Sequence, residues 1–198
     1  GLLVNGIPAF KLEKSVVARR VSLLEKRGVV FKVGVTVGRD VSLTELQLEH
    51  DAIFLGFGAQ QARPLGIPGA ELAGIYNALP FLVQKNTDAP LDVPPIDVRG
   101  KRVAVLGGGD TAMDCLRTAI RCGAADTLCI YRRDRANMPG SRKEYENSIE
   151  EGARFSFLTS PVCLLGDAEG RVTTVRCVRM ELGPPDASGR RSPRPVRG

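Results

Sequence analysis

The sequence predicts an α/β protein, and three features of its 198 residues support this prediction. Apolar residues recur at helical spacing over residues 12–27, and Gly28 stands where the helix would end. The compact apolar run at residues 51–55 is typical of a buried parallel strand. Residues 102–131 then read as strand, glycine turn, helix and strand, which together make a complete βαβ unit.

Shorter elements are expected between these features. Valine-rich runs bounded by glycine predict strands at residues 29–33 and 35–37. The sequence Ser42-Leu43-Thr44-Glu45 has the capping-box pattern of a short helix, and a further helix is expected at residues 78–84. Residues 86–100 carry three prolines and few bulky residues at any regular period, so they are the best candidate for a domain boundary.

The second half of the chain contains the βαβ unit and a hairpin. The elements expected there are, in order, strand 102–106, helix 111–121, strand 127–131, helix 142–151, strand 154–158 and a hairpin with its turn at 167–170 and its return strand at 172–182. We therefore predict two domains, residues 1–98 and residues 99–198, with a small antiparallel hairpin near the C-terminus.

Composition and charge argue against several classes of protein. No apolar stretch approaches the roughly 18 residues of a membrane span, and the N-terminus has no basic region followed by an apolar block, so a cytoplasmic location is expected. The five cysteines form no C-x-x-C pair and His50 is the only histidine, so no metal site is expected. The net charge of +6 is mild, and the arginine-rich C-terminal stretch has no interleaved aromatic residue. A solvated hairpin or fraying end is therefore a better interpretation than nucleic-acid binding.

A glycine-rich run, GGGDTA, follows the first strand of the βαβ unit. A G-x-G-x-x-G pattern alone is weak evidence, but a strand before it and a helix after it are the context that dinucleotide binding requires in a Rossmann-like domain. Gly107 would permit the sharp turn, Gly109 the approach of a pyrophosphate, and Ala112 close packing of helix and strand. Free amides and the helix dipole would face the phosphates. Asp110 and Thr111 either cap the helix or contact the ligand.

The residues after the second strand decide which nucleotide is preferred. An NAD site usually offers a carboxylate there, whereas an NADP site offers arginine for the 2′-phosphate. This chain has Arg132 and Arg133 at this place and Arg135 shortly after them. Asp134 is the one residue there that argues against NADP. Guanidinium groups form bidentate, charge-assisted bonds with phosphate, so the sequence favours NADP over NAD. A solvated basic loop is the alternative.

Several longer stretches resemble one family. The segments GGGDTAMDC (107–115), YRRDRANMPGSR (131–142), EEG (150–152) and MELGPPDASGRR (180–191) are similar to the pyridine-nucleotide domain of the small subunit of NADPH-dependent glutamate synthase. Residues 1–14, 37–40 and 51–58 resemble the flavin domain of the same family. NADPH-dependent ferredoxin reductases and the reductase module of dihydropyrimidine dehydrogenase share this architecture. The resemblance therefore implies a Rossmann-like NADP-binding domain plus part of a Rossmann-like FAD-binding domain.

The resemblance also implies a function and a set of binding residues. In such enzymes NADPH delivers hydride to FAD, and electrons leave through iron–sulfur clusters to a large subunit that makes glutamate from glutamine and 2-oxoglutarate. The protein places the nicotinamide against the flavin, so no catalytic residue is assigned. The implied cofactor-binding residues are Gly107, Gly108, Gly109, Asp110 and Thr111 at the pyrophosphate, Arg132 and Arg133 at the 2′-phosphate, and Gly58 and Ala59 in a loop at the flavin.

The chain also departs from the family pattern. It begins after the flavin-binding glycine signature, lacks the cysteine-rich segment that holds iron–sulfur clusters, and ends before the last flavin contacts. We therefore expect a fragment, with the clusters outside this chain and FAD held in the intact protein. The alternatives are a catalytically inert nucleotide-binding or docking fragment, or part of an NADPH-dependent ferredoxin reductase-type enzyme.

Overall fold

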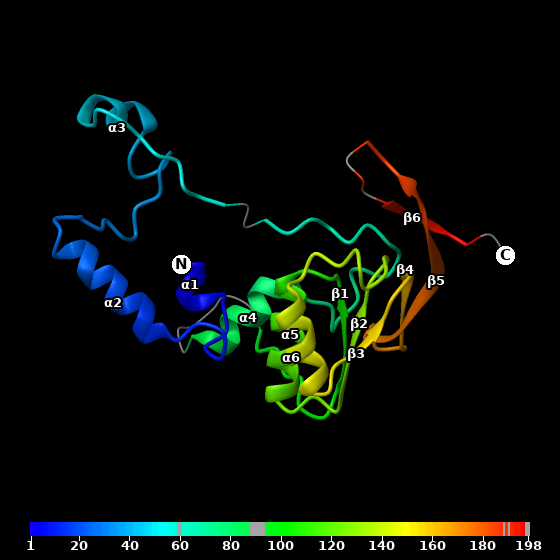
Figure 1. Cartoon of the computed structure of the whole chain (residues 1–198). Helices are drawn as coiled ribbons and strands as arrows, with labels where there is room; N and C mark the ends of the chain where they lie inside the picture. The colour runs from blue at the N-terminus through cyan, green and yellow to red at the C-terminus, as the bar shows by residue number, and fades with distance from the viewer. Residues whose placement is uncertain (59–60, 88–93, 188, 190, 197–198) are drawn as a thin grey trace. The chain divides into compact units, whose positions relative to one another are not determined.

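The computed structural model describes residues 1–58, 61–87, 94–187, 189 and 191–196 (Figure 1). The chain divides into two compact units, one made of Gly1–Leu12 and Pro64–Gly198 and the other of Glu13–Arg63. The larger unit contains both sheets, so the predicted βαβ region lies within it.

A parallel sheet forms the centre of the larger unit. Its strands are β1 (Arg102–Leu106), β2 (Asp126–Ile130) and β3 (Arg154–Ser156), in the order β1-β2-β3. Both strand pairs are parallel, with Val103 opposite Thr127 and Leu128 opposite Arg154. The predicted βαβ unit is therefore confirmed, because a helix connects two neighbouring parallel strands.

Helix α5 (Asp110–Arg121) connects β1 to β2 and is buried on several sides. It contacts both strands as well as helices α4 (Ala78–Asn86) and α6 (Arg142–Glu150). Its side chains enter two core clusters: one contains Met113 and Leu116 with residues of β2, and the other contains Cys115 and Ala119 with residues of α4. This packing fixes the start of α5, which directly follows the glycine run.

The predicted boundary at residues 98/99 lies inside the larger unit. Ile96 and Val98 are buried in the same core cluster as Phe81 and Leu82 of α4. The chain on both sides of the boundary therefore shares one core. The functional division into residues 1–98 and 99–198 stays a prediction, and residues 88–93 lie outside the described residues.

The predicted hairpin is present and has one more strand than expected. Strands β4 (Thr159–Gly166), β5 (Val172–Pro185) and β6 (Arg191–Pro195) form an antiparallel sheet in that order. The predicted turn closes between β4 and β5, where the Asp167 carboxylate accepts hydrogen bonds from the Glu169 and Arg171 amides. Pro193 and Pro195 are tolerated in β6 because it is an edge strand.

The smaller unit, Glu13–Arg63, contains two of the predicted helices. They are α2 (Lys14–Glu25) and α3 (Leu43–Glu49). The capping box at the start of α3 is confirmed: Ser42 Oγ accepts from the Glu45 amide, and a Glu45 carboxylate oxygen accepts from the Ser42 amide. A short helix that was not predicted, α1 (Leu2–Asn5), lies in the larger unit.

The strands predicted at residues 29–33, 35–37 and 51–55 are wrong. The described part of this segment has only an isolated bridge between Val37 and Val41. Phe54 is 94% exposed and Val33 is 88% exposed, so these apolar runs do not form a core. A parallel strand needs neighbouring strands, and none among the described residues pairs with these runs.

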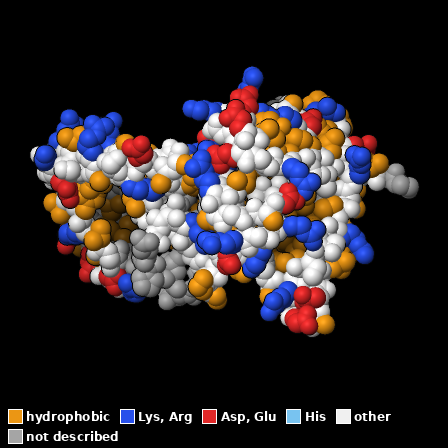
Figure 2. All heavy atoms as spheres, turned by 90° about the horizontal axis from the view of Figure 1, so that it is seen from below, with side chains coloured by type: hydrophobic (Ala, Val, Ile, Leu, Met, Phe, Trp, Pro, Cys, Tyr) orange, Lys and Arg blue, Asp and Glu red, His pale blue; other side chains and the backbone are white. Residues whose placement is uncertain are grey.

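The surface is mixed in character. On the face drawn in Figure 2, basic and acidic side chains are interspersed with apolar ones and do not gather into one broad patch of a single charge. Within the described part of the chain, no helix combines the length and the apolar character needed to cross a bilayer.

Candidate functional site

The glycine run forms a tight turn at the end of β1. Gly107 has φ 137°, a conformation that side-chain-bearing residues rarely adopt. Its amide donates to the Ile130 carbonyl at 3.1 Å, and its carbonyl accepts from the Cys129 thiol at 3.0 Å. Burial raises the pKa of Cys129 to about 12, so the thiol stays protonated and can donate. The turn is therefore fixed against β2.

A second loop closes on the glycine run. The Gly140 amide donates to the Gly108 carbonyl at 2.8 Å. A Cβ at Gly140 would lie 2.9 Å from that carbonyl oxygen, and a Cβ at Gly108 would lie 2.7 Å from the Tyr131 ring and 2.9 Å from Met138. Both positions need glycine because there is no room for a side chain. The sequence interpretation missed Gly140, although the Pro139-Gly140-Ser141 sequence before a helix was a usable signal.

The third glycine opens helix α5 and faces free space. Gly109 is the N-cap residue, it makes no side-chain cap, and no atom lies within 4 Å of a Cβ placed on it. Its carbonyl accepts the Ala112 and Met113 amides at 2.9 and 3.2 Å. The first turn of a helix leaves amides without intrahelical partners, and the dipole adds partial positive charge there. This end of α5 can therefore accept an anionic group such as a pyrophosphate.

The two residues that were left open between capping and ligand binding have different surroundings. The Asp110 carboxylate accepts a hydrogen bond from the Ser141 amide at 2.9 Å, so its side chain ties α5 to the N-cap residue of α6. Thr111 is exposed on the first turn. This bond uses one carboxylate oxygen of Asp110, and its backbone amide is the group suited to an anionic ligand.

The two arginines after β2 lie in a loop that a backbone hydrogen bond ties to the residues after β3. Leu158 has φ 50°, which is unusual for a residue other than glycine, and its amide donates to the Arg133 carbonyl at 3.0 Å. Arg132 is exposed, whereas Arg133 is half-buried and its Nε atom is buried with no hydrogen-bond partner. Buried polar atoms without partners are rare in proteins, so Arg133 Nε is a donor that a bound group could use.

The neighbouring charged residues are engaged by the protein. The Asp134 carboxylate accepts from both the backbone and the side-chain amide of Asn137, at 2.9 and 2.7 Å. The Arg135 guanidinium lies 3.9 Å from the centre of the Tyr145 ring. The carboxylate that argued against NADP is thus hydrogen-bonded to Asn137 within its own loop, and the guanidinium groups of Arg132 and Arg133 suit a phosphate.

The residues present fit a phosphorylated dinucleotide. The bare helix start suits a pyrophosphate, the missing side chain at Gly109 leaves space for it, and the unpartnered Arg133 Nε suits a further phosphate. Among the described residues, no group of three His, Cys, Asp or Glu side chains is arranged to hold a metal ion.

The predicted flavin loop belongs to the smaller unit. Gly58 is exposed, and no atom lies within 4 Å of a Cβ built on it. Ala59 lies outside the described residues. The assignment of this loop to the flavin stays a prediction.

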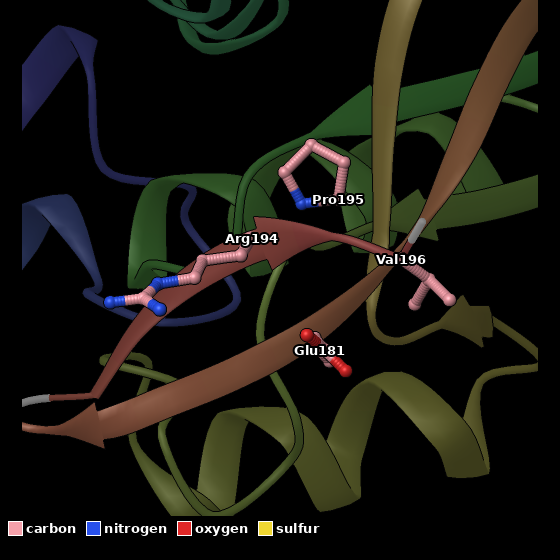
Figure 3. A pocket seen from close by; sticks show the side chains of 4 residues that line it. All are labelled: Glu181, Arg194, Pro195 and Val196. Carbon is pink, nitrogen blue, oxygen red and sulfur yellow. The ribbon is translucent and has the colours of Figure 1, made fainter. Parts of the chain in front are cut away.

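A separate hollow lies at the C-terminal hairpin. It has a volume of about 610 Å³ and is lined by Glu181 of β5 and by Arg194, Pro195 and Val196 at β6 (Figure 3). Arg194 points away from the Glu181 carboxylate in this view. None of the lining residues belongs to the glycine run or to the arginine loop, so this hollow is distinct from the candidate site.

Comparison with known proteins agrees with this geometry. Residues 11–174 match the pyridine nucleotide-disulphide oxidoreductase family. The chain is 48% identical to the small chain of NADPH glutamate synthase from Escherichia coli (strain K12), over 100% of this chain and 43% of the relative. It is 50% identical to the corresponding small chain from Halomonas elongata, over 100% of this chain and 42% of the relative. The predicted resemblance is thus confirmed, and the chain spans less than half the length of these relatives.

A solved structure shows the same fold. The FprA protein of Mycobacterium tuberculosis, in complex with NADPH, superimposes with a TM-score of 0.78 at 21% identity, covering 99% of this chain and 57% of that chain. The predicted fold class, a Rossmann-like α/β protein with a small antiparallel hairpin near the C-terminus, is confirmed, and the hairpin is part of a three-stranded sheet. The chain belongs to the pyridine nucleotide-disulphide oxidoreductase family.

Proposed function

We propose that this chain is the NADPH-binding portion of a flavin-dependent oxidoreductase. The observation that carries the proposal is the uncapped start of α5 together with the buried, unpartnered Arg133 Nε in the loop after β2. The 48% identity to a glutamate synthase small chain that is named for NADPH supports the same nucleotide.

Each part of the nucleotide is assigned to particular groups. The pyrophosphate lies against the backbone of Gly107, Gly108 and Gly109 and the first amides of α5, at Asp110 and Thr111. Backbone donors suit this role because they are fixed by the turn and need no rearrangement on binding. The 2′-phosphate lies at Arg132 and Arg133, whose guanidinium groups form charge-assisted bonds with it.

In the intact protein, the bound cofactors supply the redox chemistry, in which NADPH donates hydride and FAD accepts it. The residues of this chain bind and orient the nucleotide, and no side chain serves as a general base. Gly58 and Ala59 are assigned to a loop beside the flavin. The family resemblance implies iron–sulfur clusters outside this chain, which would carry electrons to a large subunit that forms glutamate. We place this assembly in the cytoplasm.

The nucleotide assignment is tested by titrating NADPH and NADH against the chain by calorimetry. We expect tighter binding of NADPH, and we expect Arg132→Ala and Arg133→Ala to reduce that preference roughly tenfold or more, because a lost charge-assisted phosphate contact costs about 1.5 to 3 kcal/mol. Arg20→Ala, in exposed helix α2, is the matched control and leaves the preference unchanged. Equal affinities for both nucleotides in all variants would rule out the NADP assignment.

The flavin assignment is tested by the visible absorption spectrum of the purified chain. A flavin band in near-stoichiometric amount supports a chain that retains FAD. A colourless chain that still binds NADPH limits the function of this part to nucleotide binding. Phe54 is 94% exposed and Phe57 is 80% exposed. These residues adjoin the predicted flavin loop and have no packed environment, which favours the second outcome.

A further inference from the structure

Charged side chains attach the segment Gly1–Leu12 to helices α5 and α6. Lys11 Nζ donates to Asp114 Oδ1 at 3.0 Å and lies 3.9 Å from Glu144 Oε2. The side chain of Asp114 is 8% exposed and that of Glu144 is 12% exposed. Charges in such a poorly hydrated place interact more strongly than they do on an open surface.

A ring contact reinforces this attachment. The Phe10 ring lies 4.3 Å from the Arg117 guanidinium and 4.4 Å from that of Arg121. Arg117 in turn donates to Glu144 at 2.8 Å and to Glu151 at 2.8 Å. Phe10 and Lys11 thus contact one continuous ion network that spans α5 and α6.

The position of Lys11 in the chain gives the network a second consequence. Leu12 is the last residue of the larger unit before the chain enters the unit Glu13–Arg63. Lys11 therefore fixes the point at which the chain first leaves the unit that carries the glycine run.

Both partners of Lys11 lie on helices that are joined at the glycine run. Asp114 is about one turn along α5 from Asp110, and Glu144 is in the first turn of α6. The Asp110 carboxylate accepts from the Ser141 amide at the start of α6. Desolvation raises the pKa of Asp114 despite the bond from Lys11, and the charges of Glu144 and Asp110 raise it further. The charge of Asp110, at the start of α5, therefore acts on the same carboxylate that Lys11 contacts.

Resting on the proposed function, we propose that Lys11 is a positioning residue that couples occupancy of the dinucleotide site to the order of the segment Gly1–Leu12. A bound pyrophosphate immobilises the first turn of α5, and with it the arrangement of Asp114 and Glu144 that Lys11 needs. In return, the Lys11 cation offsets the two carboxylates behind the pyrophosphate, which lowers their repulsion of the anionic ligand. Such coupling is reciprocal between the two places.

Hydrogen–deuterium exchange with mass spectrometry tests this coupling on the chain itself, with and without saturating NADPH. In the wild type we expect NADPH to slow exchange in peptides covering residues 107–113 and, by about fivefold, in those covering residues 2–12. Lys11→Gln keeps the first effect and loses the second. Lys11→Arg keeps both, because it retains the cation, and the control Lys26→Gln keeps both as well.

Two results would overturn the coupling while leaving the nucleotide site intact. One is protection of residues 107–113 with no change at residues 2–12 in the wild type, and the other is equal protection of residues 2–12 in the wild type and Lys11→Gln. Absence of protection at residues 107–113 removes the nucleotide site itself, so the two failures are distinguishable. If Lys11→Gln does not fold, absence of protection at residues 2–12 in the wild type still overturns the coupling, and Lys11→Arg still tests whether a cation at this position retains it.

Discussion

At the scale of single residues, the three consecutive glycines do three different things. Gly107 is required by its backbone conformation, with φ 137°. Gly108 is required by its neighbours, because a Cβ there would meet the Tyr131 ring and Met138. Gly109 is required by neither, since it has φ −89° and open space around it. Glycine is a common N-cap residue, and at this last position it also leaves the backbone open to a ligand.

This difference gives a matched pair of substitutions. We expect Gly108→Ala to lower the free energy of unfolding by about 1 to 3 kcal/mol, the usual cost of overpacking. Gly109→Ala should leave the free energy of unfolding within about 0.5 kcal/mol of the wild type, because its backbone is compatible with alanine. Urea unfolding followed by circular dichroism measures both.

NADPH binding should distinguish the two variants in another way, because Gly109→Ala, the variant with little effect on stability, is the one expected to weaken binding. Gly109→Ala keeps the fold and weakens NADPH, because the added methyl group occupies the space assigned to the pyrophosphate. A Gly109→Ala chain that binds NADPH as tightly as the wild type would contradict the proposed position of the ligand.

At the scale of helices and strands, α5 and α6 are joined by arginine–carboxylate contacts. Arg117 and Arg121 both donate to Glu151, with distances from 2.8 to 3.1 Å. Burial raises the pKa of Glu151, but the hydrogen bonds from Arg121 and Arg117 outweigh it and the net pKa is lowered. The charged carboxylate therefore stabilises the pairing of the two helices.

The sign of this pKa shift predicts a pH dependence. The pKa of Glu151 is 4.5 in the unfolded chain and lower in the folded chain. The stabilisation is therefore fully present above pH 4.5 and is lost as the pH falls through the folded pKa. We expect Glu151→Gln to cost about 1 to 2 kcal/mol of unfolding free energy at neutral pH and progressively less as the pH falls below 4.5.

Denaturant unfolding at several pH values checks this prediction. The control is Glu146→Gln, which removes an exposed pair between Glu146 and Arg142 and should have little effect at any pH. A cost for Glu151→Gln that stays constant from neutral to acid pH would show that charge is not the cause.

The elements that the sequence predicted correctly are those with local signals. The β1 bounds were predicted without error, because the strand is a short apolar run directly before glycine. The α3 helix was predicted by its capping box, whose two hydrogen bonds join residues within one turn. Periodicity predicted α2 and α5 for the same reason.

The errors have a common physical cause, which is dependence on distant partners. The apolar run at residues 51–55 reads as a strand, but a strand forms only beside another, and none pairs with it among the described residues. The hydrogen bond between the Gly140 amide and the Gly108 carbonyl joins residues that are far apart in the sequence, so no local pattern predicts it. The site prediction therefore contained the glycine run and the arginines and missed the loop that closes on them.

At the scale of the whole molecule, the proposed nucleotide site lies entirely in one compact unit. The glycine run, the arginine loop and the closing loop all belong to the unit made of Gly1–Leu12 and Pro64–Gly198. The other unit, Glu13–Arg63, exposes large apolar side chains such as Val30, Leu48 and Phe54. Nucleotide binding is accordingly the part of the proposed function that this chain can carry by its own contacts.

The most direct test of this account is an experimental structure of the chain with bound NADPH. The account predicts the pyrophosphate against the amides of Gly109 and the first turn of α5, and the 2′-phosphate within hydrogen-bond distance of the Arg132 and Arg133 guanidinium groups, with the Arg133 Nε atom no longer unpartnered. A nucleotide bound elsewhere, or one whose 2′-phosphate contacts neither arginine, would contradict it.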